Sequence, residues 1–276
     1  MQLPYRFVNS RLFLAIVVGA AGWFGLTLVM WNQWQMKGLI AGLALQAIPL
    51  FFILFEILMR LVYQKRRNEI DIEQMQILCG LYPTLKPEYP LFDLRRHAMS
   101  PDSLALYQIA IAHNKPKIIL ELGSGISTVV SSLTLKRLGV GRVIALDDSE
   151  KWAENTRTTL QLQGSEEYAE VRYAPLVKSK VGDRSSNWYD LDVLKDINKI
   201  DLLLIDGPVD SDDEGLRYPA LPLLADKLSE KAIIFADDCF RPNWKSLVLN
   251  WASDNSFTVE EPYPNEKNTI ILKRGF

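Results

Sequence analysis

The sequence predicts an α/β fold for residues 96–276, with a mostly parallel sheet that carries helices on both faces, preceded by a transmembrane helical hairpin. Three observations predict it. Short apolar runs alternate with amphipathic stretches from about Pro101 onward, as in sheets whose strands are joined by helices. The first of these runs ends in a glycine turn, and two long uncharged runs open the chain. The expected division is a hairpin anchor at 1–63, a charged and proline-punctuated connector at 64–95, and the α/β domain at 96–276.

Two N-terminal segments are long and apolar enough to cross a membrane. Residues 12–31 are 20 residues without a charge, and residues 38–55 are another 18. At the rise of an α-helix, each can span a hydrocarbon layer of about 30 Å. Trp23, Trp31 and Trp34 gather toward the loop between them, where an aromatic belt is expected. A cleaved signal peptide and a buried helical hairpin are the competing interpretations, and the length of the first segment disfavours the signal peptide.

The basic residues that flank these segments indicate their orientation. Arg6 and Arg11 precede the first segment, Lys37 lies between the two, and four basic residues at 60–67 follow the second. Positively charged flanks stay in the cytoplasm. We therefore expect a two-pass protein of the cell (inner) membrane, in contact with membrane lipid, whose termini and α/β domain are cytoplasmic.

Composition excludes some classes of partner. The 31 Lys and Arg residues nearly balance the 33 Asp and Glu residues, so no broad basic face for nucleic acid is expected. The two cysteines, Cys79 and Cys239, lie far apart in the sequence. This usage is typical of reduced thiols in a cytoplasmic domain.

Seven strands and four helices are expected in the α/β domain. The strands are the apolar runs at 118–122, 143–146, 170–173, 202–205, 232–236, 257–260 and 269–272. The helices are the amphipathic stretches at 127–138, 150–163, 218–228 and 244–253. No helical pattern separates the last two strands, so they are expected to form an antiparallel hairpin at the sheet edge.

A glycine turn follows the first strand within residues 117–128. Gly123 and Gly125 let the backbone turn tightly and approach a ligand, while Ser127 and Thr128 can cap a helix whose N-terminal amides favour electron-rich groups. A dinucleotide fingerprint would have its third glycine where Thr128 stands. The turn therefore predicts a nucleotide-type ligand other than a dinucleotide, with an ordinary strand-to-helix turn as the alternative.

Acidic residues follow four of the predicted strands at the edge where ligands bind in open α/β sheets. Asp147 ends the second strand 22 residues beyond Gly125, a distance that suits a bidentate hydrogen bond to the two hydroxyls of a ribose. Asp148 and Ser149 fit capping of the next helix equally well.

Three further carboxylates, Asp206, Asp237 and Asp238, follow the fourth and fifth strands. Their mutual repulsion is costly unless a cation or protons offset it. Hard oxygen ligands in this number suit Mg²⁺. The alternatives are that these acids cap turns, or that Arg241 neutralises one of them without an ion.

Glu121-x-Gly-x-Gly resembles motif I of the class I S-adenosylmethionine (SAM)-dependent methyltransferases. Further similar segments occur in the same order as in a bacterial branch of that family, and the resemblance covers roughly residues 96–276. These segments are Tyr173-Ala-Pro-Leu176, Trp188-Tyr-Asp190, Ile205-Asp-Gly-Pro208, Arg217-Tyr-Pro-Ala-Leu-Pro222 and Asp237-Asp-Cys-Phe-Arg241. The resemblance implies a Rossmann-like seven-stranded methyltransferase sheet.

The resemblance also implies roles for individual residues. Glu121 would hold the methionine end of SAM, Asp147 its ribose, and Ala174 would lie near the adenine. The implied metal site, similar to that of catechol O-methyltransferase, is formed by Asp206, Asp237 and Asp238. The full implied cofactor set is Glu121, Gly123, Ser124, Gly125, Ser127, Thr128, Asp147, Asp148 and Ala174.

The sequence departs from the catechol enzymes at the general base, because Val209 stands where they have a lysine. Asp206 and His97 are the candidate catalytic residues instead. The expected function is O-methylation of a small-molecule or lipid-linked hydroxyl acceptor, such as a glycan or polyketide. A SAM-binding or inactive module that acts in a membrane assembly is the alternative, and an iron-dependent hydroxylase on the same scaffold is disfavoured because the chain has only two histidines.

Overall fold

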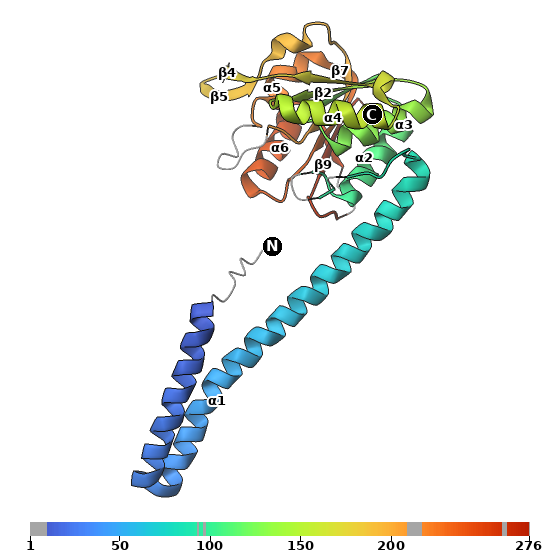
Figure 1. Cartoon of the computed structure of the whole chain (residues 1–276). Coiled ribbons are helices and arrows are strands. Elements are labelled where there is room, and N and C mark those ends of the chain that lie inside the picture. The colour runs from blue at the N-terminus through green and yellow to red at the C-terminus, as the bar shows by residue number, and fades with distance from the viewer. Residues whose placement is uncertain (1–9, 93, 96–97, 209–216, 261–263, 276) are drawn as a thin grey trace. The chain divides into compact units, whose positions relative to one another are not determined.

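The computed structural model describes residues 10–92, 94–95, 98–208, 217–260 and 264–275. The chain divides into two compact units, 1–72 and 73–276 (Figure 1). The helices are α1 (Ser10–Leu85), α2 (Pro101–Asn114), α3 (Ile126–Leu138), α4 (Glu150–Leu162), α5 (Ala220–Leu224) and α6 (Pro242–Asp254), with short 3₁₀ turns at Glu166–Tyr168, Leu191–Leu194 and Ala225–Lys227. The strands are β1 (Ile118–Leu122), β2 (Arg142–Asp147), β3 (Ala169–Tyr173), β4 (Leu176–Val181), β5 (Arg184–Tyr189), β6 (Ile200–Ile205), β7 (Leu228–Ala236), β8 (Thr258–Glu260) and β9 (Ile270–Arg274).

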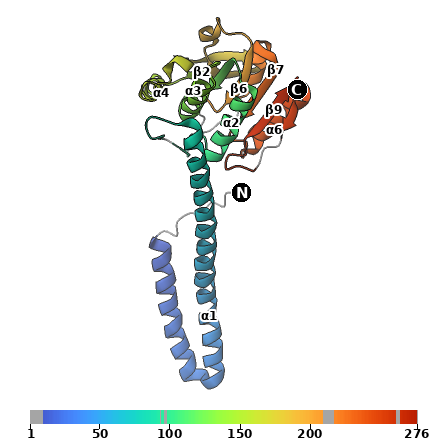
Figure 2. The ribbon, with the colours of Figure 1, turned by 90° about the vertical axis from the view of Figure 1, so that its right-hand side faces the viewer.

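The first unit consists of the long helix α1, which is helical without a break although its ribbon bends back on itself in Figure 2. Among the described residues, one stretch of it, Ala47–Leu85, includes a window long and apolar enough to cross a membrane, and none of that window is buried. The structure thus contains one such helix, and the expected division into two separate spans is not confirmed. The last turns of α1 belong to the second unit.

The second unit contains a seven-stranded sheet in the order β3-β2-β1-β6-β7-β9-β8. Strands β3, β2, β1, β6 and β7 pair in parallel. Strand β9 runs antiparallel to both β7 and β8, so the expected antiparallel hairpin at the edge is confirmed. Because the first five strands are parallel, their carboxyl ends lie at one edge of the sheet, the edge where ligands bind in such folds.

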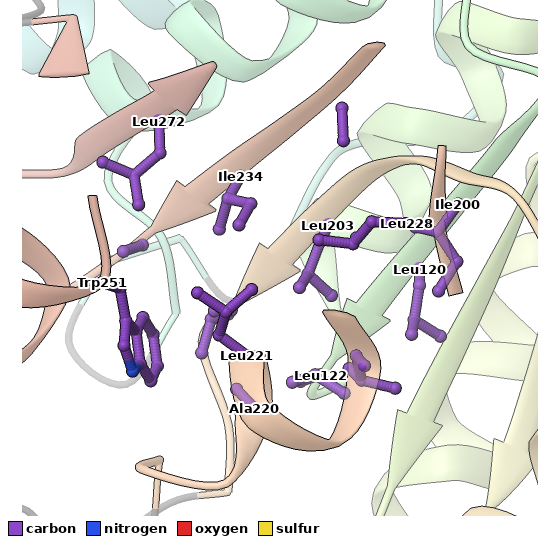
Figure 3. Packing of buried hydrophobic residues seen from close by; sticks show 14 of the residues in the cluster. Leu120, Leu122, Ile200, Leu203, Ala220, Leu221, Leu228, Ile234, Trp251 and Leu272 are labelled. Carbon is purple, nitrogen blue, oxygen red and sulfur yellow. The ribbon is translucent and has the colours of Figure 1, made fainter. Parts of the chain in front are cut away.

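Alternate residues of the central strands face opposite sides of the sheet, as strand geometry requires. Leu120 and Leu122 belong to a core shared with α5 and α6, and Figure 3 labels Leu221 and Trp251 of these helices among its side chains. Ile119 belongs to a second core shared with α2, α3 and the end of α1. Two cores on opposite faces explain why these strands are almost uninterrupted apolar runs.

Two elements differ from the expected pattern. The β4–β5 hairpin is a separate two-stranded antiparallel sheet that the sequence did not predict, because its alternating polar residues form no apolar run. The helix expected at 218–228 is only α5 with a 3₁₀ turn after it. Pro219 is the N-cap residue of α5 and Pro222 lies in its first turn, where the missing N–H of proline keeps the helix from beginning earlier.

Candidate active site

The glycine turn joins β1 to α3 at the carboxyl edge of the sheet. Gly123 has φ +99° and Gly125 has φ +151°, a region that side-chain-bearing residues rarely adopt. The N–H of Gly123 donates to the carbonyl oxygen of Leu146 at 2.9 Å, which ties the turn to β2. Thr128 Oγ1 accepts from the N–H of Gly125 at 3.2 Å, so the predicted capping role of Thr128 is present. The N-cap residue of α3 is thereby bonded to the first turn of the helix.

Glu121 is completely buried behind this turn and accepts four hydroxyl hydrogen bonds. Its Oε1 accepts from Tyr107 at 3.0 Å and from Ser131 at 2.7 Å. Its Oε2 accepts from Ser127 at 3.0 Å and from Thr128 at 2.8 Å. Burial raises the pKa of Glu121, and the hydroxyl donors partly oppose that rise. Glu121 therefore anchors α2 and α3 to β1, a role that sequence reasoning had not assigned to it.

Asp147 lies at the end of β2 and is bonded directly to the glycine turn. Its Oδ2 accepts from Ser124 Oγ at 2.6 Å and from the N–H of Ser124 at 3.2 Å. Its Oδ1 accepts from the N–H of Ser149 at 2.9 Å. The residue Asp148 is exposed as a whole. Its carboxyl group is partly shielded from water, and this shielding, together with the smaller effect of the charge of Asp147, raises the pKa of Asp148. The carboxylate of Asp147 is thus held in one orientation at the position expected for a ribose contact.

Ala174 and Tyr189 lie beside this acid. Ala174 is buried, and its N–H donates to the carbonyl oxygen of Asp147 at 2.8 Å. Tyr189 Oη is buried and has no hydrogen-bond partner among the described residues. Burial, then the charges of Asp148 and Asp147, raise the pKa of Tyr189 well above its usual value. A Cβ on Gly207 would lie 2.4 Å from that oxygen, so Tyr189 packs directly on the turn after β6.

The second acidic group lies after β6 and β7. Burial raises the pKa of Asp206 to about 6. Burial and repulsion from Asp206 raise the pKa of Asp237 to about 7. Asp237 Oδ1 accepts from Thr269 Oγ1 at 2.6 Å, whereas its Oδ2 is buried without a hydrogen-bond partner among the described residues. The expectation that Asp206, Asp237 and Asp238 lie close together is met.

Basic side chains surround Asp238. Its Oδ2 lies 3.2 Å from Arg217 Nη2 and 3.7 Å from Arg241 Nη2, and its Oδ1 lies 2.9 Å from Lys267 Nζ. Burial alone would raise the pKa of Asp238, but the three cations outweigh it, so the pKa lies below its usual value. Asp238 also has φ +59°, a left-handed conformation that costs about 1 kcal/mol for a residue with a side chain.

Residues 120–239 match the family model described as a methyltransferase domain. This stretch of the chain is therefore similar to methyltransferase domains. The matched region begins in β1 and ends just after Asp238, so it includes the glycine turn and both acidic groups.

A solved methyltransferase structure shares this fold, whereas no curated protein sequence matches the chain. The SAH-bound methyltransferase PaMTH1 from Podospora anserina is 15% identical, with a TM-score of 0.52, over 76% of this chain and 95% of that one. An O-methyltransferase from Bacillus cereus in complex with SAH is 20% identical, with a TM-score of 0.47, over 73% of this chain and 89% of that one.

The predicted Mg²⁺ site in the methyltransferase domain is not supported. Among the described residues, no group of three His, Cys, Asp or Glu side chains has an arrangement that could hold a metal ion. The physical reason is that Arg217 and Lys267 already contact both carboxylate oxygens of Asp238. His97, the second catalytic candidate, and Val209 lie outside the described residues.

Sequence reasoning missed several residues that shape the methyltransferase site. Arg217 and Lys267 lie 21 and 29 residues from Asp238, and Thr269 lies 32 residues from Asp237. The sequence signal for Arg217 was its place at the start of the segment 217–222, shortly after an acidic run. Tyr107, which bonds to Glu121, had no signal at all, because an aromatic residue in a helix is usually core.

Proposed function

We propose that the chain is a membrane-anchored SAM-dependent methyltransferase that methylates a hydroxyl oxygen of a small-molecule or lipid-linked acceptor. The bond between Ser124 and Asp147 is the observation that carries the proposal. It orients a carboxylate at the strand end next to a turn whose glycines leave the backbone open. A ligand with a ribose and a polar tail suits this combination.

The residues present fit SAM. Asp147 Oδ1 accepts one hydrogen bond and keeps a lone pair for a ribose hydroxyl, whereas Oδ2 already accepts two from Ser124. The buried hydroxyl of Tyr189, which has no hydrogen-bond partner among the described residues, packs on the neighbouring turn after β6. SAM, when bound, supplies a methyl group on a positively charged sulfur. The contribution of the protein is to hold this cofactor and the acceptor in line, which accounts for most of the acceleration expected in such transfers.

Two carboxylates are the proposed acceptors for the proton of the hydroxyl. Asp206 and Asp237 both have pKa values raised toward neutrality, to about 6 and about 7, a range in which a carboxylate is a more effective base. Asp237 Oδ2 is buried without a partner among the described residues. His97 remains a third candidate from the sequence.

Membrane attachment supports the choice of acceptor. The apolar stretch in α1 and the two uncharged N-terminal runs are those of an anchor, and the flanking basic residues favour a cytoplasmic methyltransferase domain at the inner membrane. A tethered domain meets membrane-borne intermediates at high local concentration. A hydroxyl of a glycan, a polyketide or a lipid-linked molecule is the acceptor class we propose.

SAM binding by the full chain in detergent tests the proposal. Isothermal calorimetry should give one SAM per chain. Asp147→Asn should weaken binding at least tenfold, because the amide keeps the shape but replaces one acceptor oxygen with a donor. Glu154→Gln, an exposed change on α4 outside the predicted cofactor set, should bind like the wild type. A wild type that binds no SAM would rule out the methyltransferase activity, and SAM binding without any turnover on hydroxyl acceptors would favour the binding-module alternative.

The anchor is tested separately. After cell fractionation, the chain should stay with membranes through alkaline carbonate extraction, and a chain without residues 1–63 should be released. Tags at both ends should be protected from protease in intact spheroplasts. Release of the full chain by carbonate would contradict the membrane anchor, but it would not contradict the proposed methyl transfer.

A further inference from the structure

A guanidinium lies between the two acidic strand ends of the methyltransferase domain. Arg217 Nη2 is 3.7 Å from Asp206 Oδ1, after β6, and 3.2 Å from Asp238 Oδ2, after β7. The same group donates to the carbonyl oxygen of Asp206, and Nη1 donates to the carbonyl oxygen of Asp237 at 3.2 Å. The side chain of Arg217 is only 9% exposed. One buried cation therefore binds side-chain and backbone oxygens of both strand ends.

These are the oxygens that would have to bind a divalent ion if the acidic group were a metal site. A metal bridging Asp206 and Asp238 would need the space that the guanidinium takes, and two cations within a few ångströms repel each other strongly in a buried setting. Lys267 Nζ occupies the other oxygen of Asp238 at 2.9 Å. Both carboxylate oxygens of Asp238 therefore already contact basic side chains.

The local charge also needs no metal. If all three carboxylates are ionised they carry three negative charges, and Arg217, Lys267 and Arg241 bring three positive charges to Asp238. Arg217 is further fixed by Trp244, whose ring centre lies 5.7 Å from its guanidinium carbon. The arginine is thus held in place by packing as well as by charge.

We propose that Arg217 is an internal cation that takes the place of a divalent metal between Asp206 and Asp238, so that this site binds and orients its ligands without a metal ion. Arg217 is a positioning residue, since it holds the two acids and the strand ends that carry them. The proposal concerns the same site as the proposed methyl transfer, but metal binding is measured without SAM or acceptor. A negative result in the metal experiment therefore does not contradict the proposed methyl transfer, and the reverse also holds.

Mn²⁺ binding to the full chain in detergent, followed by paramagnetic resonance and calorimetry, tests this role. The wild type should bind no Mn²⁺ at this site. Arg217→Ala opens the space between the two acids, so this variant should bind Mn²⁺ with an affinity at least tenfold higher than that of the wild type. Adding Asp238→Asn should remove that binding. The melting temperature of Arg217→Ala should rise with Mn²⁺ or Mg²⁺, whereas that of the wild type should not change.

Two control variants separate position from charge. Arg241→Ala removes a cation from the rim of the same acid but leaves Arg217 in place, so it should bind no Mn²⁺. Arg217→Lys keeps a cation in the space and should also stay metal-free. Stoichiometric Mn²⁺ binding by the wild type that Asp238→Asn abolishes would overturn the proposal, and so would a folded Arg217→Ala that binds none.

Arg217→Ala could fail to fold, because it leaves buried acids unpaired. In that case refolding is compared with and without Mg²⁺. Recovery that depends on Mg²⁺ supports the proposal, since the ion then replaces the guanidinium. Refolding that stays unsuccessful with Mg²⁺ overturns it.

Discussion

Ser124 Oγ donates a 2.6 Å hydrogen bond to Asp147 Oδ2 and so joins the glycine turn after β1 to the last residue of β2. The two residues lie 23 positions apart in the chain. Because the N–H of Ser124 donates to the same oxygen at 3.2 Å, the turn and the acid form one unit. A ligand that contacts Asp147 meets a carboxylate whose orientation is already set.

Ser124→Ala should weaken SAM binding about tenfold. The lost hydrogen bond has a charged acceptor, and such bonds contribute about 1.5–3 kcal/mol. The part of this energy that orients Asp147 for the ligand is lost from the free energy of SAM binding. Calorimetry with SAM measures it. Ser149→Ala is the matched control, since only the backbone N–H of Ser149 bonds to Asp147. Equal affinities for Ser124→Ala and the wild type would show that Asp147 does not depend on this bond.

Glu121→Gln should lower the free energy of unfolding by about 2 kcal/mol, because one side of the amide cannot accept the hydroxyl bonds that Glu121 accepts. The substitution also removes the energetic cost of burying a charged carboxylate, so the loss of unfolding free energy stays limited. Thermal unfolding of the full chain in detergent is the measurement. Glu154→Gln, on an exposed ion pair with Arg157, should change stability by no more than about 0.5 kcal/mol. Similar effects of the two substitutions would contradict the anchoring role of Glu121.

Stability should fall as the pH rises through the range in which Asp237 ionises. Burial and repulsion raise its pKa to about 7, so the folded state binds this proton more tightly than the unfolded chain does. The stabilisation is present at low pH and lost between about pH 4 and pH 7. Asp237→Asn has the shape of the protonated acid and cannot ionise. The difference in free energy of unfolding between this variant and the wild type should therefore grow in favour of the variant by on the order of 3 kcal/mol from pH 5 to pH 8. Parallel stability curves for the two proteins would rule out the raised pKa.

Gly207→Ala should destabilise the domain by about 2–4 kcal/mol, because the new Cβ would lie 2.4 Å from Tyr189 Oη and 3.0 Å from the carbonyl oxygen of Leu122. Adding Tyr189→Phe removes the nearer atom and should recover part of the loss, a coupling that a double-mutant cycle measures. Gly80→Ala, where a Cβ meets nothing within 4 Å, should be neutral or stabilising. Additive effects of the Gly207 and Tyr189 substitutions would mean that the two do not touch.

Patterns with strong local causes were predictable. The strands of the main sheet are uninterrupted apolar runs because both faces of the sheet are covered, so β1, β6 and β7 could be recognised from the sequence. The β4–β5 hairpin could not be recognised, because much of its surface is in solvent and its polar residues give no periodic signal.

By itself, the sequence determined the α/β class, the glycine turn and the acids at the ends of the strands, because strand burial and backbone freedom depend on residue type at short range. Only the tertiary structure decided what those acids contact. Tyr107 comes to Glu121 from 14 residues away, and Arg217 comes to Asp238 from 21. The balance between a metal and an internal cation depends on which charges meet in space. That balance depends on where Arg217, before α5, and Lys267, before β9, meet Asp238, which local residue patterns do not encode.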